Sequence, residues 1–139
     1  MPSLPSLVAA RLTSTVGAAR TVYTNGVPDD PADRYLVVWS NAGLLDSDRA
    51  VDVPNRVAGS VWVTSVARHP IGSSSRGQAT DEALWAAVAA RGALVGWSPT
   101  IGTECHPGEH LASSPPQRDE SLPGVVVYVV DQYGFTYQP

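Results

Sequence analysis

The sequence contains no lysine, and its nine basic residues are all arginines. This absence excludes a Walker-A phosphate site, a Schiff base and a lysine general base. The single cysteine, Cys105, cannot form an internal disulfide, so the fold must depend on packing. Charged residues make up only 16% of the chain, and the formal net charge is −4. This charge balance argues against a general binder of nucleic acid or membrane surfaces.

Long apolar runs are also missing. The longest, residues 125–130, is far shorter than the roughly 20 residues of a membrane-spanning helix. The opening residues carry no basic leader and only a short apolar stretch, so we expect no secretory signal. With 139 residues, of which 43% are hydrophobic, the chain is long enough to bury a real core. We therefore expect a single domain over residues 1–139.

Two helices are predicted from the spacing of apolar residues. The first covers residues 4–16, where four apolar residues fall on one helical face: Leu4, Leu7, Val8 and Leu12. The second covers residues 76–91. Ser75 and Gln78 have the spacing of a capping box at its start, and Gly92 is placed to end it.

The strands are predicted from continuous or alternating apolar residues. Residues 35–39 form a short apolar run, and residues 57–67 alternate with period two. Residues 125–130 and 135–137 form either one long strand with a bend near Asp131 or a tight hairpin. We expect the 57–67 strand to pack under the second helix, with four largely buried residues: Val61, Val63, Leu84 and Val88.

This order of elements predicts an α+β fold, in which a small antiparallel β-sheet is covered on one face by two α-helices. Two long loops are expected, at about residues 41–56 and 98–123. The tryptophans are expected to pack in the core or at a subunit interface. They are Trp39, Trp62, Trp85 and Trp97.

Residues 105–110 carry the side chains of a possible metal site. Residues 106–110 match the H-x-x-E-H string of a zinc protease family, which needs a helix to bring both histidines to one side. Pro107 and Gly108 break such a helix, and the proline alone costs about 3 kcal/mol. We therefore predict no metal, no cofactor and no catalytic residue. The less favoured alternative is a small metal-binding hydrolase with a loop site made of Cys105, His106 and His110.

Short segments along the chain share their order and spacing with one protein family. They are VWVTSVAR at 61–68, QA at 78–79, LW at 84–85, GWSP at 96–99, RD at 118–119, Pro123 and YVVD at 128–131. In these segments the chain resembles the tail terminator (tail completion) proteins of long-tailed phages, of the lambda-like type that infects actinobacterial hosts. The resemblance covers residues 4–137, but residues 105–110 have no counterpart in it.

The resemblance implies a structural virion protein rather than an enzyme. Members of this family form a ring, typically hexameric, on the head-proximal end of the phage tail tube. The ring stops tube polymerisation and joins the tail to the head-completion (stopper) protein. For this chain the resemblance therefore implies a homo-oligomer assembled in the host cytoplasm, with the tail tube protein and the stopper as partners. DNA passes through the lumen without specific binding, and no membrane is involved.

Other assemblies and other contacts are also considered. The alternative within the same particle is another head–tail connector, a stopper or a tube protein. Connections longer than about 12–15 residues without regular structure are uncommon in compact domains and are usually functional or disordered. We expect the 98–123 loop to be ordered by a neighbouring subunit or ring, and the 41–56 loop to be a second contact. The predicted contact residues are Asp46, Asp48, Arg49, Trp97, Arg118 and Asp119.

Overall fold

Helices and strands make up most of the part of the chain that the structure, a computed structural model, describes. That part comprises residues 3–17, 19–40, 44–45, 57–69, 76–102 and 104–138. The helices are α1 (Leu4–Thr15) and α2 (Arg76–Leu94). The strands are β1 (Thr21–Thr24), β2 (Arg34–Ser40), β3 (Leu44–Leu45), β4 (Val57–His69), β5 (Glu104–Cys105), β6 (Glu109–Ser113), β7 (Gln117–Arg118) and β8 (Val125–Gln138).

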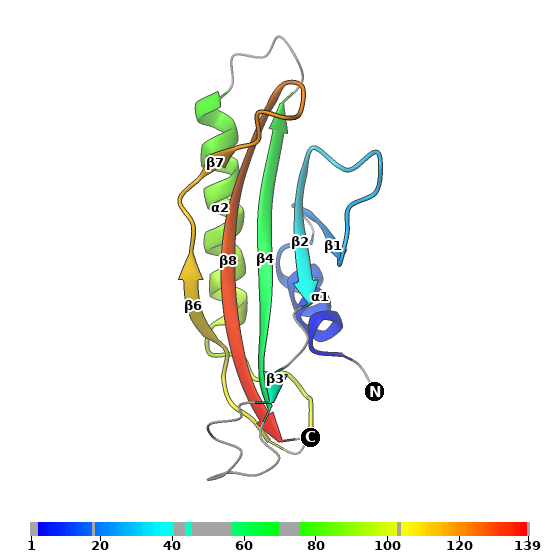
Figure 1. The fold of residues 1–139 in the computed structure, drawn as a ribbon, viewed down its shortest axis with the longest axis vertical. Helices are drawn as coiled ribbons and strands as arrows, with labels where there is room; N and C mark the ends of the chain where they lie inside the picture. Colours follow the sequence, from blue (N-terminus) through cyan, green and yellow to red (C-terminus); the bar gives the residue numbers. More distant parts are fainter. Residues whose placement is uncertain are drawn as a thin grey trace.

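These strands form one sheet built around the long pair β4 and β8. The strand order is β1-β2-β4-β8-β5, while β3 also pairs with β4, and β6 and β7 also pair with β8. β4 pairs with β8 along its whole length of 13 residues, and the two strands run side by side down the molecule (Figure 1). β1 and β2 are parallel, and the other strand pairs among the described residues are antiparallel. The sheet is therefore larger than the small sheet predicted, and mixed rather than antiparallel.

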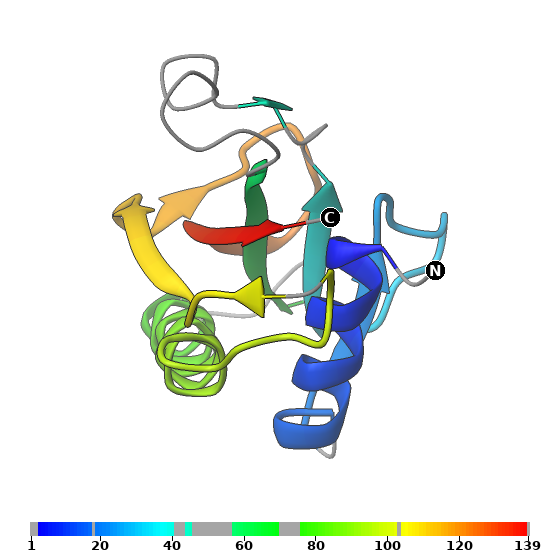
Figure 2. The ribbon, with the colours of Figure 1, turned by 90° about the horizontal axis from the view of Figure 1, so that it is seen from below.

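Both helices lie on the same face of the sheet (Figure 2). α1 begins after Ser3, whose Oγ accepts a hydrogen bond from the Ser6 N–H at 3.3 Å. Three residues of the predicted α1 face are buried in the main core: Leu4, Val8 and Leu12. The α+β class and the placement of two helices on one face of the sheet are therefore confirmed.

α2 packs on the sheet through small residues, which corrects its predicted inner face. Val61 and Val63 on β4 are buried as expected, but Leu84 and Val88 are 39% and 63% exposed. The buried residues of α2 are Ala79, Ala83, Ala86, Ala87, Ala90, Ala93 and Leu94. The prediction took large apolar side chains to mark the inner face. Alanines instead let the helix backbone come close to the sheet, because a well-packed interior leaves no room for larger side chains there.

Two elements, α2 and β8, also differ from the prediction. α2 continues past Gly92 to Leu94, while Ser75 of the predicted capping box lies outside the described residues. β8 runs as one strand from Val125 to Gln138, with no turn at Asp131. One long strand, rather than a hairpin, is therefore correct.

The segment 98–123 is not a loop without regular structure. It contains β5, β6 and β7, and all three pair with the same edge of β8. The period-two pattern missed them because none is longer than five residues, and β6 is exposed at four of its five positions. Of the predicted 41–56 loop, the structure describes only residues 44–45, which form β3. The rest of that loop lies outside the described residues.

Candidate contact surfaces and a buried carboxylate

The outer side of α2 presents a run of large apolar residues, here called the α2 stripe. Its members are Leu84, Trp85, Val88 and Val95, which are 39%, 51%, 63% and 45% exposed. Leu84 and Val88 are four residues apart and share one helical face, and Val95 lies directly after the last residue of α2. A helix that is apolar on both sides is usually covered on both sides. The α2 stripe is therefore a candidate contact surface.

The sheet face opposite the helices is here called the open face. Part of it is buried, as a cluster of Tyr35, Val37, Val66 and Val126. Strand pairing places four of its residues in one row across β2, β4, β8 and β6: Trp39, Trp62, Gln132 and Ala112. The residues on either side of them in sequence, such as Val38, Val63 and Tyr133, belong to the core under the helices. Because successive side chains of a strand point to opposite faces, this row points away from the helices.

Leu111 adds to the open face beside this row. An ideal Cβ added at Gly134 of β8 would lie 2.8 Å from Leu111 Cδ1, so the leucine side chain covers that glycine. Leu111 is 52% exposed and Trp39 is 39% exposed. The Trp39 Nε1–H donates a hydrogen bond to Thr64 Oγ1 at 3.1 Å, which fixes the indole on the sheet. Large apolar side chains are thus held in place at the surface.

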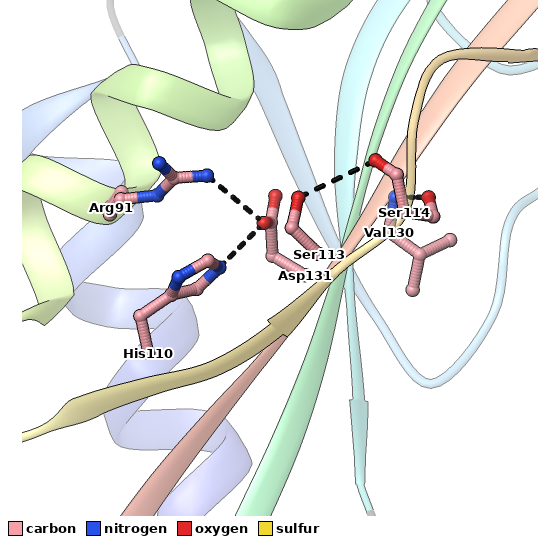
Figure 3. Close-up of polar contacts among 6 residues, drawn as sticks. All are labelled: Arg91, His110, Ser113, Ser114, Val130 and Asp131. Atoms are coloured by element: carbon pink, nitrogen blue, oxygen red, sulfur yellow. Dashed lines mark hydrogen bonds and ion pairs between the residues drawn. The ribbon is translucent and has the colours of Figure 1, made fainter.

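α2, β6 and β8 meet at a buried carboxylate, Asp131 on β8 (Figure 3). Its side chain is 1% exposed, and one of its oxygens, Oδ1, lies 2.8 Å from His110 Nε2 and 3.4 Å from Arg91 Nη2. The other oxygen, Oδ2, has no hydrogen-bond partner among the described residues. A buried charge is stable only when it is paired, so these two contacts hold β6 and α2 to the sheet.

The surroundings of Asp131 are apolar and aromatic. The Tyr133 ring lies 5.3 Å from the His110 ring, and burial, together with the nearby Asp131 charge, raises the pKa of Tyr133. Asp131 is buried too deeply to touch a dissolved substrate. Its contacts instead connect β8 to α2 and β6 inside the subunit. Sequence reasoning missed this cluster, although a signal was present: Asp131 occupies an inward position between Val129 and Tyr133 in an apolar strand.

A second polar cluster joins α2 to β2 and β4 near the surface. Arg34 binds Glu82 with two hydrogen bonds, Nε to Oε2 at 2.7 Å and Nη2 to Oε1 at 3.0 Å. His69 Nε2 lies 3.3 Å from Glu82 Oε2. The hydrogen bond from Arg34 lowers the pKa of Glu82, and the same contact raises the pKa of Arg34. The guanidinium of Arg20 lies nearby, 4.7 Å from the ring centroid of Trp85.

Glu82→Gln is expected to destabilise the protein by about 1 kcal/mol or less at neutral pH, because Arg34 is partly exposed and water screens the pair. Since folding lowers the pKa of Glu82, its contribution is present above the usual value of 4.5 and is lost as the pH falls through the lowered pKa. Urea denaturation of both proteins over falling pH should therefore show their difference shrinking in acid. The exposed neighbour change Asp81→Asn is the control, and a pH-independent difference would contradict this account.

The side chains of the possible metal site lie apart. Cys105 is opposite Tyr137 on β8, and His110 is opposite Tyr133. These partners are four residues apart, which is about 13 Å along a strand. Among the described residues, no group of three or more His, Cys, Asp or Glu side chains could hold a metal ion. Burial also raises the pKa of the Cys105 thiol, which makes its reactive thiolate scarcer.

The structure places three of the six predicted contact residues, in three different settings. Trp97 is half-buried, with its ring packed edge-on against Phe135 at 6.0 Å and the Arg11 guanidinium 5.6 Å from its centroid. Arg118 is exposed on β7. Asp119 Oδ1 accepts a hydrogen bond from the Ser121 N–H at 3.0 Å. The other three, Asp46, Asp48 and Arg49, lie outside the described residues. The contact role of all six stays a prediction.

Comparison with known proteins identifies the fold. No protein-family model and no curated protein matches this sequence. Among the described residues, no helix has the length and apolar character needed to cross a membrane. A second solved structure, covering 96% of each chain at 18% identity, has a TM-score of 0.49 and is too distant to support an argument. The fold matches a chain in the solved virion of a native gene transfer agent particle, at 16% identity and a TM-score of 0.64, over 99% of this chain and 96% of that chain.

Proposed function

We propose that the protein is a structural subunit of a phage-like virion. One observation carries this proposal: nearly the whole chain has the fold of a chain in a gene transfer agent virion. The α2 stripe and the open face support it, because subunits of an assembly keep exposed apolar side chains for their neighbours.

Within the virion, the role that fits best is that of a tail terminator. Such a subunit forms a ring, typically of six copies, on the head-proximal end of the tail tube, ends tube growth and joins the tail to the stopper. Support comes from the sequence resemblance over residues 4–137 and from the α+β layering that the resemblance implies.

The physical features of the chain suit a ring through which DNA passes. A cyclic ring uses head-to-tail contacts, in which two different patches of each subunit meet. The short edge strands β1 and β6 would be protected where neighbouring subunits cover them. The net charge of −4 disfavours adhesion of the DNA backbone to the protein. The proposed role is structural, and in it the Asp131 cluster holds β6 and α2 to the sheet.

Deletion of the gene that encodes this protein from the genome that encodes the phage-like particle tests the tail-terminator role directly. We expect tails of uncontrolled, increased length and heads without attached tails, as seen by negative-stain electron microscopy. Expression of the protein in trans should restore tail length and joining. Purified protein should give a discrete ring near six subunits by native mass spectrometry, alone or with tube protein.

Each alternative role has a different outcome in the same experiment. Tails of normal length that fail to join heads would indicate a stopper or connector instead. A complete loss of tails would indicate a tube protein. Virions with normal tails and normal joining would contradict a tail role altogether.

A further inference from the structure

We infer that the subunit holds an internal water molecule beside Asp131, which joins Asp131 Oδ2 to two donors, the Tyr133 hydroxyl and Arg91 Nε. The site lies between α2 and β8, where the Arg91 and Asp131 side chains point toward one another (Figure 3). The inference concerns the inside of one subunit, so it is independent of the proposed role in a virion.

The first argument comes from three buried polar atoms. Asp131 Oδ2, Tyr133 Oη and Arg91 Nε are all buried, and none has a hydrogen-bond partner among the described residues. Asp131 and Tyr133 as whole residues are 1% and 0% exposed, so bulk solvent does not reach their side chains. Leaving three such groups unpaired costs more free energy than ordering one water molecule. These atoms therefore call for a ligand that hydrogen-bonds to them.

The second argument is that the three atoms surround one place. Arg91 Nη2 lies 3.4 Å from Asp131 Oδ1, which brings the guanidinium to the same carboxylate. Asp131 and Tyr133 are two residues apart on β8 and share its inward face, so they are about 7 Å apart along the strand. Burial and the Asp131 charge raise the pKa of Tyr133, while the Arg91 guanidinium opposes this rise. Both charged groups thus lie near the tyrosine hydroxyl.

The third argument is the chemistry that the ligand must have. It has to donate a hydrogen bond to a carboxylate oxygen and accept hydrogen bonds from a hydroxyl and a guanidinium N–H. One water molecule does all of this, and buried waters make about three such bonds. An anion has no proton to donate and is repelled by Asp131, whereas a metal cation is repelled by Arg91. Among the described residues, no group of three or more metal-ligating side chains is present either.

His110 leaves Oδ2 to the water and closes the site on the β6 side. Its Nε2 lies 2.8 Å from Asp131 Oδ1, and its ring lies 5.3 Å from the Tyr133 ring. With α2 on one side and β6 on the other, the water can leave only when the protein opens locally. It should therefore stay bound for much longer than a water molecule at the surface.

A high-resolution crystal structure of the wild-type protein tests the position of the water. We expect an ordered water within about 3.2 Å of Asp131 Oδ2, of the Tyr133 hydroxyl and of Arg91 Nε. A direct hydrogen bond from Tyr133 or Arg91 Nε to Oδ2 would overturn the inference. The lack of any water bonded to both Oδ2 and the Tyr133 hydroxyl, beside well-ordered side chains, would overturn it as well.

Oxygen-17 relaxation dispersion, which counts long-lived internal waters, tests the same site in solution. Asp131→Leu replaces the carboxylate with an apolar side chain of similar size, so the count should fall by one. Tyr133→Phe removes one hydrogen bond, so the water should bind about 2- to 12-fold more weakly and exchange faster by that factor. Tyr137→Phe on the same strand is the matched control, because the Tyr137 hydroxyl is not one of the buried atoms without a partner.

Circular dichroism and melting temperature verify the fold of each variant. Tyr133→Phe changes a single atom and tests the site without Asp131→Leu, should the latter fail to fold. Folded Asp131→Leu with an unchanged count of internal waters would overturn the inference. Equal water exchange in Tyr133→Phe and Tyr137→Phe would do so too, because the Tyr133 hydroxyl would then not hold the water.

Discussion

Replacing His110 with alanine is expected to lower the free energy of unfolding by roughly 3 kcal/mol, since it removes the shorter of the two side-chain contacts of the buried Asp131 carboxyl group. Asp131, which is 1% exposed in the intact protein, would keep only Arg91, at 3.4 Å. A domain of this kind is stable by about 5–15 kcal/mol, so the loss is a large fraction of the total. Urea denaturation followed by tryptophan fluorescence measures it.

A double-mutant cycle assigns this loss to the buried charge. In an Asp131→Asn background the site holds no carboxylate, so His110→Ala should cost clearly less than it does in the wild type. Glu109→Ala is the matched control, because Glu109 is the exposed neighbour of His110 on the same strand. An equal cost of His110→Ala in both backgrounds would show that lost packing on Tyr133, rather than the contact with Asp131, explains the effect.

The second large effect concerns α2. Enlarging a buried alanine of this helix should destabilise the protein more than truncating one of its exposed leucines. Ala86→Leu should cost roughly 3 kcal/mol, because Ala86 is fully buried against the main core and a longer side chain must displace its neighbours. Leu84→Ala should cost about 1 kcal/mol or less, because Leu84 is 39% exposed in the subunit. A fully buried leucine would instead cost about 2–5 kcal/mol.

Melting temperatures of the two variants test this comparison within one helix. Ala86→Leu should lower the melting temperature by about 5 °C or more, and Leu84→Ala by clearly less. The measurement should be made at a concentration where the protein is monomeric, since Leu84 belongs to the α2 stripe, a candidate contact surface. A larger loss for Leu84→Ala would show that α2 packs through its large residues after all.

The main elements of the fold could be predicted from periodicity. The α1 face of Leu4, Val8 and Leu12 and the alternation of β4 follow from the sequence because each buries a regular face. The strands β2 and β8 follow from their continuous apolar runs, which are buried on both faces of the sheet. The short strands β1, β5, β6 and β7 could not be predicted in this way. Their pairing depends on the exposed edges of β2 and β8, which are features of the folded sheet and not of the local sequence.

The contact surfaces were harder to predict than the fold, and for one physical reason. An apolar residue on a helix looks the same in sequence whether its own sheet or a neighbour covers it. Leu84 and Val88 were assigned to the core for this reason, and the alanine side of α2 was overlooked. The Asp131 cluster could not be predicted as a unit, because Arg91, His110 and Asp131 come from three elements that only the fold brings together.

The long pairing of β4 with β8 has a mechanical consequence. The two strands run along the longest axis of the molecule and are paired over 13 residues, and β8 is paired on its other edge as well (Figure 1). Because antiparallel ladder bonds lie across the strands, a pull along this axis loads all of them in shear at once. A pull across the sheet would instead open the bonds one after another, like a zip. The subunit therefore resists force most strongly along β8. An assembly under tension would be hardest to pull apart if that strand were aligned with the load.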